Sequence, residues 1–164
     1  MSMMYCLRLA TPEELNTLVN EPDMVEEWLF DTEETPADAE LGKSWHGIHF
    51  LLTGSEYEGE KPYCYLLSES QEIGEDLGYG PARILTSEQA NEFSACLENI
   101  DEADFKSRYD RHKQDMDKKD IYPGGWQSGN DSENFDFLFS NLTTLKEFLK
   151  KASDSKYGAV LWLE

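Results

Sequence analysis

The first hundred residues contain very few basic side chains. Only four Lys or Arg residues face 21 Asp or Glu residues there, and the whole chain of 164 residues carries a formal net charge of −20. Binding of nucleic acid needs clustered Lys and Arg to neutralise phosphates, so this charge excludes a nucleic-acid partner. The same field would attract a basic protein, although a large net charge is also an ordinary means of keeping a protein soluble.

Long apolar runs, a leader peptide and paired cysteines are also missing. No stretch approaches the roughly twenty apolar residues of a membrane span, and residues 1–6 lack the basic start and apolar core of a signal peptide. Cys6, Cys64 and Cys96 are far apart and show no CxxC spacing, which indicates reduced thiols packed as small hydrophobes. We therefore expect a cytoplasmic protein without a membrane partner.

The apolar pattern predicts one domain over residues 1–164. Hydrophobic residues make up 39 % of the chain, which is enough for a core. Apolar runs predict strands near residues 3–9, 63–67, 82–86 and 158–163, with helices between them. This order indicates an α+β fold, a small mixed or antiparallel sheet of about four strands covered by several helices in a single pair of layers. Residues 32–40 are expected to form an exposed loop.

A segment without any acidic residue, Lys43–Gly54, contains two of the three histidines. Its large apolar residues and one histidine recur at helical spacing: Trp45, Ile48, His49 and Leu52. The segment is therefore predicted to be a buried helix with Gly54 as a left-handed C-terminal cap. Three roles are open for His46 and His49: core packing, acid–base chemistry or ligand contact, and a metal site. His46 lies off the apolar stripe and is the better functional candidate.

A glycine-rich loop, Gly74–Pro81, leads to Arg83, one of the four basic residues of the first hundred. Backbone amides beside a guanidinium have the ingredients of an anion clamp. The loop has neither a Gly-Lys-Ser/Thr ending nor a Rossmann glycine triplet, so it is not a nucleotide-phosphate motif. The simpler alternative is a tight turn in which Arg83 pairs with a nearby acid.

A rigid aromatic turn, Ile121–Trp126, interrupts the helical pattern. Tyr122 and Trp126 each offer an apolar body and one polar group, which suits either a pocket wall or a helix end. The candidate ligand-binding residues, taken together, are Trp45, His46, His49, Tyr79, Arg83, Tyr122 and Trp126. A pocket made from them requires the helix at 45–49 and the loop at 79–83 to converge.

Three of these segments resemble the signature blocks of one family. Lys43–Gly54, Gly78–Arg83 and Ile121–Pro123 look, in order and spacing, like the corresponding blocks of the YfbM-like family, small bacterial proteins with a domain of unknown function. The resemblance implies a single α+β domain in the bacterial cytoplasm. The resemblance does not assign an activity, a cofactor or a catalytic residue to this chain.

Two functional hypotheses follow from these features. No HExxH pattern and no nucleophile elbow is present, so the first is a non-catalytic binding module that engages a basic protein partner through its acidic surface, as an immunity or inhibitor protein would. The alternative is a site for a small or anionic ligand where the 45–49 helix meets the 79–83 loop. In an enzymatic form of that site, His46 or His49 would transfer protons and Arg83 would hold an anionic group. No cofactor or metal is predicted, and the sequence leaves the oligomeric state open.

Overall fold

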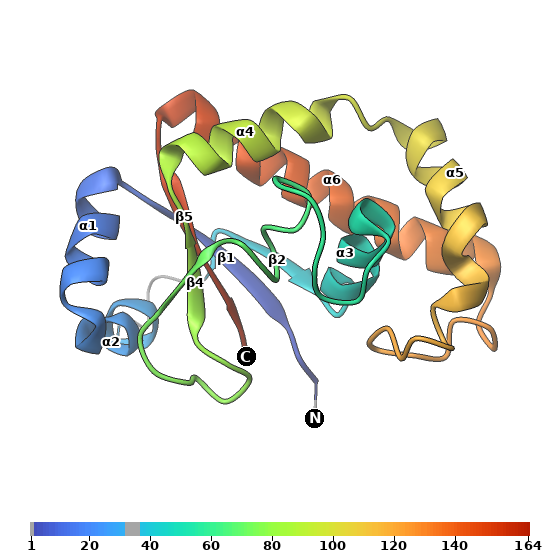
Figure 1. Ribbon diagram of the computed structural model, residues 1–164, viewed down its shortest axis with the longest axis horizontal. Helices are drawn as coiled ribbons and strands as arrows, with labels where there is room; N and C mark the ends of the chain where they lie inside the picture. The colour runs from blue at the N-terminus through green and yellow to red at the C-terminus, as the bar shows by residue number, and fades with distance from the viewer. Residues whose placement is uncertain (1, 32–36) are drawn as a thin grey trace.

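The computed structural model describes residues 2–31 and 37–164, and the strands in these ranges form one antiparallel sheet. In the spatial order β2-β1-β5-β4-β3 the strands are β2 (Ala39–Gly42), β1 (Tyr5–Ala10), β5 (Gly158–Leu163), β4 (Ala82–Leu85) and β3 (Gln71–Ile73). The first and last strands pair at the centre of the sheet, with Tyr5 opposite Leu163 and Ala10 opposite Gly158 (Figure 1).

Helices cover both faces of the sheet. On one face lie α1 (Pro12–Asn20) and α2 (Val25–Phe30), joined by the 3₁₀ turn Pro22–Met24. The other face is covered by α3 (Trp45–Thr53), α4 (Ser87–Glu98), α5 (Glu102–His112) and the long α6 (Asp131–Ser155), with a 3₁₀ turn at Lys113–Asp115 (Figure 1). The larger core lies between the sheet and α3–α6, and a smaller core lies beneath α1 and α2.

Alternation along the central strands divides their side chains between the two cores. Tyr5 and Leu7 of β1 face the larger core, whereas Cys6 and Ala10 face the smaller one, as the period of two in a strand requires. The predicted α+β class with an antiparallel sheet is confirmed. The sheet has five strands rather than about four, and α1 and α2 add a thin third layer to the predicted single pair.

The prediction of a strand at residues 63–67 is wrong. The chain makes successive tight turns there, in which the Tyr65 amide donates to the carbonyl of Pro62 at 3.1 Å and the Ser68 amide donates to Cys64 at 2.8 Å. A short apolar run does not distinguish a strand from any other buried segment. Two short strands, β2 and β3, were missed. β2 overlaps the end of the predicted loop at 32–40, of which residues 32–36 lie outside the described ranges.

The acid-free segment forms the buried helix that its spacing predicts. Every residue from Trp45 to Leu52 is buried, and Gly54 ends α3 with a left-handed φ of 77°. A side chain at Gly47 would place its Cβ 2.7 Å from Leu138 of α6, so glycine permits the close approach of the two helices. Arg108 of α5 donates to the carbonyls of Leu51 and Leu52, each at 3.2 Å, and thereby satisfies the C-terminal end of α3.

A buried cation attaches the α1–α2 layer to the sheet. The guanidinium of Arg8 on β1 donates to the carbonyls of Trp28 at 2.7 Å and Leu29 at 3.0 Å. It also lies 5.0 Å from the Trp28 ring and 5.6 Å from the Trp162 ring. Because the carbonyls at a helix C-terminus carry partial negative charge, Arg8 both satisfies the end of α2 and complements its dipole.

Candidate functional site

A cavity of about 520 Å³ opens where the start of β1, the start of α3, the loop before β4 and the turn at residues 120–124 meet. Its volume lies in the range of ligand pockets, roughly 300–1,000 Å³. Five of the seven candidate residues from the sequence line it: Trp45, His46, Tyr79, Arg83 and Tyr122. The structure therefore brings the first turn of α3 and the loop at 79–83 to the same cavity.

The other two candidates do not line the cavity. His49 has no exposed surface and lies on the buried stripe of α3. Trp126 is buried in the larger core, where its indole Nε1 donates to the carbonyl of Ile121 at 2.8 Å. Trp126 thus fixes the turn at 121–126 from within the core.

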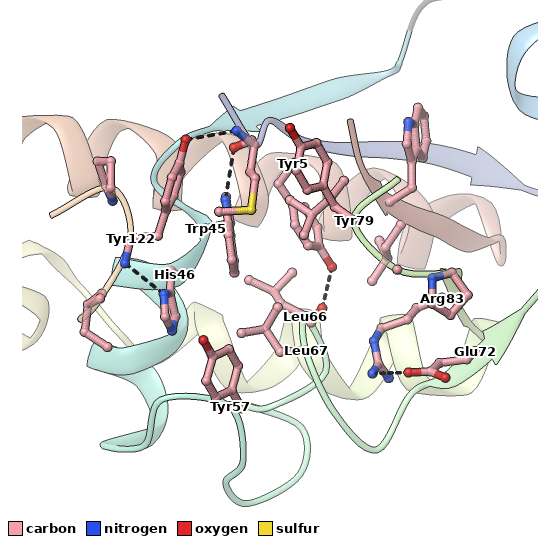
Figure 2. Close-up of a pocket in the computed structure, with 18 of the residues that line it drawn as sticks. Tyr5, Trp45, His46, Tyr57, Leu66, Leu67, Glu72, Tyr79, Arg83 and Tyr122 are labelled. Atoms are coloured by element: carbon pink, nitrogen blue, oxygen red, sulfur yellow. Dashed lines mark hydrogen bonds and ion pairs between the residues drawn. The ribbon is translucent and has the colours of Figure 1, made fainter. Parts of the chain in front are cut away.

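Four aromatic rings form a stack at one end of the cavity (Figure 2). The ring of His46 lies 5.0 Å from that of Trp45 and 5.1 Å from that of Tyr57, with interplanar angles of 13° and 29°. Tyr122 stacks on Trp45 at 5.7 Å. We call Tyr57, His46, Trp45 and Tyr122 the aromatic stack. Its outermost member, Tyr57, leaves 61 % of its surface exposed, whereas Trp45 and His46 are buried, so the stack reaches the solvent at Tyr57.

Hydrogen bonds determine which ring nitrogen of His46 carries the proton. The backbone amide of Tyr122 donates to Nδ1 at 2.9 Å, so Nδ1 is unprotonated. The proton is therefore on Nε2, which donates to the carbonyl oxygen of Glu56 at 2.8 Å. Burial lowers the pKa of His46, and the bond to Glu56 opposes this only in part. His46 is thus a neutral imidazole with both nitrogens engaged, and it has no free lone pair with which to accept a proton.

At the other end of the cavity, Arg83 is engaged by its own neighbours (Figure 2). Its Nη2 donates to Glu72 Oε1 at 2.8 Å, and its Nη1 donates to the carbonyl of Ser70 at 2.8 Å. Glu72 and Arg83 are cross-strand partners in the β3–β4 pair, which places the two side chains on the same face of the sheet. Arg83 thus pairs with a nearby acid, which is the simpler of the two alternatives.

The backbone amides of the glycine-rich loop are also occupied. Asp76 Oδ1 accepts hydrogen bonds from the amides of Gly78 at 2.7 Å and Gly80 at 3.0 Å. These two donors hold the pKa of the Asp76 carboxyl below its ordinary value. The amides and the guanidinium that suggested an anion clamp therefore already bind two carboxylates of this chain, Asp76 and Glu72.

Sequence reasoning missed several residues of the cavity. The Tyr5 side chain of β1 donates from its hydroxyl to the carbonyl of Leu66 at 2.6 Å. Tyr57 covers one face of His46. The carboxylates of Asp120 and Glu72 also line the cavity. A tyrosine within an otherwise acidic exposed turn was the available signal for Tyr57. The position of Glu72 depends on β3, a strand of three residues without apolar alternation.

Two further features of the described residues bear on chemistry. No group of three or more His, Cys, Asp or Glu side chains in residues 2–31 and 37–164 is arranged to hold a metal ion. Among the helices of these ranges, none combines the length and the apolar character needed to cross a bilayer.

Comparisons with known proteins show the family and the fold. A family model described as "Domain of unknown function (DUF1877)" matches residues 1–162. Among solved structures, the chain is similar to YfbM, a protein of unknown function from Escherichia coli, with a TM-score of 0.74 and 16 % sequence identity over 100 % of both chains. At that identity the likeness shows the fold alone. No curated protein matches the chain. The resemblance to the YfbM-like family is confirmed.

Proposed function

Because this chain belongs to the family of the domain of unknown function DUF1877, a membership that assigns no activity, we propose from its geometry that it binds a small organic molecule in the cavity beside the aromatic stack, without catalysis. The observation that carries the proposal is the convergence of Trp45, His46, Tyr57 and Tyr122 on one cavity of ligand size. Concave sites with aromatic walls and a few polar groups are typical of small-molecule recognition.

The hydrogen bonds of the cavity support recognition rather than reaction. A general base needs a free lone pair within reach of the substrate, and both nitrogens of His46 are engaged by backbone groups. The Tyr5 hydroxyl donates to Leu66, and burial raises its pKa far above the ordinary value. Arg83 is paired with Glu72. These groups are therefore suited to fixing the shape of the cavity.

Removal of the outermost ring should weaken ligand binding. We expect Tyr57→Ala to reduce the affinity for flat aromatic fragments about three- to tenfold, because one aromatic contact contributes roughly 0.5–1.5 kcal/mol. Tyr157→Ala is the matched control, since Tyr157 is also an exposed tyrosine, at 37 %, but does not line the cavity. Binding is measured from the indole N–H signals in two-dimensional NMR spectra during titration with a set of neutral, cationic and anionic aromatic fragments.

Among the four tryptophans, Trp45 presents its indole to the cavity. The indoles of Trp28 and Trp162 lie on the α1–α2 face of the sheet, and that of Trp126 lies in the larger core. Fragments that bind as proposed should move the Trp45 indole signal and leave the other three in place. If no fragment at millimolar concentration moves the Trp45 signal, or if Tyr157→Ala weakens binding as much as Tyr57→Ala does, the cavity is not a ligand site.

A second candidate function, binding of a basic protein, is favoured by the surface of the α1–α2 layer. Residues 12–31 contain seven acids and no Lys or Arg. These acids are all exposed, and no ion pair engages any of them within the described ranges. Three large apolar side chains are exposed among them: Val19, Met24 and Phe30, at 38, 40 and 46 %. We call residues 12–31 the acidic face. Exposed apolar groups inside a field of one sign favour a partner of opposite charge.

Charge reversal on the acidic face should abolish capture of such a partner. We expect a basic protein captured from a lysate of the source organism at low salt to be lost when Glu26 and Glu27 are both changed to Lys, and to dissociate as salt rises. The control changes Glu98 of α4 and Glu147 of α6 to Lys, which alters the net charge equally on another surface. Equal loss with the control, or capture that is insensitive to salt, would count against a specific acidic interface.

A cytoplasmic location belongs to the same proposal. Cys6, Cys64 and Cys96 are free thiols, and the first two are buried. Free thiols are the state that a reducing compartment maintains, which supports the cytoplasm of a bacterium as the place where this protein acts.

A further inference from the structure

We propose that the ligand of the cavity is an organic cation, an ammonium or guanidinium group carried on a small apolar body. This inference rests on the proposed function, because it names the chemical class that the same cavity would take. The charged side chains of the lining are two carboxylates, Glu72 and Asp120, and one guanidinium, Arg83. Since Arg83 is already neutralised by Glu72, the remaining charge of the lining is negative.

The groups that could attract an anion are satisfied within the chain. Asp76 occupies the amides of Gly78 and Gly80, and Glu72 and Ser70 occupy Arg83. An anionic ligand would have to displace a carboxylate of the protein from one of these donors while approaching a chain of net charge −20. A cation meets no such competitor, and the field of the protein raises its local concentration.

The aromatic lining offers the second attraction that a cation needs. Ring faces carry partial negative charge and bind ammonium and guanidinium groups at about 6 Å or less from the ring centroid. Tyr57 stacks on His46 at 5.1 Å yet remains 61 % exposed, so much of its ring is open to the solvent. Aromatic rings bordered by carboxylates favour a cation over a neutral or anionic molecule of the same shape.

The test compares three probes that share one ring and differ in charge: benzyltrimethylammonium, benzyl alcohol and benzenesulfonate. Each is titrated into the full chain, and the indole N–H signal of Trp45 reports binding. We expect benzyltrimethylammonium to bind about tenfold more tightly than benzyl alcohol, as a desolvated cation–aromatic contact would give, and benzenesulfonate to bind least tightly.

Two variants locate the effect in the cavity. Glu72→Gln should weaken binding of benzyltrimethylammonium about fivefold and strengthen binding of benzenesulfonate, because it removes one carboxylate and releases Arg83. Glu75→Gln removes the same charge from a residue that does not line the cavity, and it should leave both affinities nearly unchanged. Circular dichroism and the unfolding midpoint of each variant show whether the fold is retained.

The outcomes separate the ligand class from the proposed function. If benzyl alcohol or benzenesulfonate binds as tightly as the cation, the class is overturned while the cavity remains a ligand site. Equal effects of Glu72→Gln and Glu75→Gln would show a response to net charge alone and would also overturn the class. If none of the three probes moves the Trp45 signal, the class and the proposed function both fail.

Discussion

Replacement of Gly158 by alanine is expected to lower the free energy of unfolding by about 3 kcal/mol or more, the range of severe steric changes in a core. A Cβ at this position would collide with the carbonyl oxygen of Leu85 and lie 2.5 Å from Leu15 Cδ1. The backbone has little room to retreat, because Gly158 is paired with Ala10 and the next residue, Ala159, is paired with both Leu9 and Leu85.

Chemical denaturation of the variant measures this loss, with Gly129→Ala as the control. Gly129 has no left-handed φ, and a Cβ there would meet the side-chain amide of Asn134 at 3.2 Å, a group that can move. We expect the control to change the free energy of unfolding by about 0.5 kcal/mol or less, as for ordinary surface substitutions. A Gly158→Ala protein as stable as the control would show that the sheet and α1 can separate at this point.

Acidification should destabilise the protein through His49. Burial, and secondarily the charge of His46, lowers the pKa of His49 to about 4 from an ordinary value of 6.5. Neither ring nitrogen makes a well-formed hydrogen bond to any residue that the structure describes, so charge on this ring is poorly compensated. The unfolded chain takes up a proton on this imidazole near pH 6.5, whereas the folded chain does so only near pH 4.

Between these two pH values the unfolded state binds more protons, so stability falls as the pH falls. The loss in the free energy of unfolding that is due to His49 should approach about 3 kcal/mol at pH 4, since one pKa unit corresponds to about 1.4 kcal/mol. His46 acts in the same direction. The measurement is the free energy of unfolding of the wild type and of His49→Leu at several pH values from 7 to 4. Carboxylates contribute alike to both proteins, so the difference between them isolates His49, and parallel pH profiles would contradict this account.

Local pattern was sufficient to predict α3, because its signal lies within one segment. The helical spacing of Trp45, Ile48 and Leu52 identified the buried stripe, and Gly54 was recognised as the left-handed cap. The same pattern separated His49, which lies on the stripe, from His46, which lines the cavity. A periodicity of 3.6 residues is a direct property of the helix backbone, so it can be read without knowledge of the tertiary fold.

The partners of the candidate side chains could not be predicted in this way. Arg83 was expected to meet either an anionic ligand or a neighbouring acid, and only the pairing of β3 with β4 identifies Glu72 as that acid. The bonds of His46 to Glu56 and Tyr122 join segments that lie 10 and 76 residues away along the chain. Such contacts depend on the packing of whole elements, for which a single sequence contains no local signal.

The pairing of β1 with β5 has a consequence for the order in which the protein can fold as it is made. β1 is synthesised before all six helices, but its central partner β5 is synthesised only after α6. Until then both the sheet and the wall of the cavity at Leu161–Leu163 are incomplete, and β1 lacks the strand with which it pairs along its whole length. Pairing over so long a separation is entropically costly and slow. Until β5 has been synthesised, the nascent chain therefore exposes apolar surface that favours aggregation.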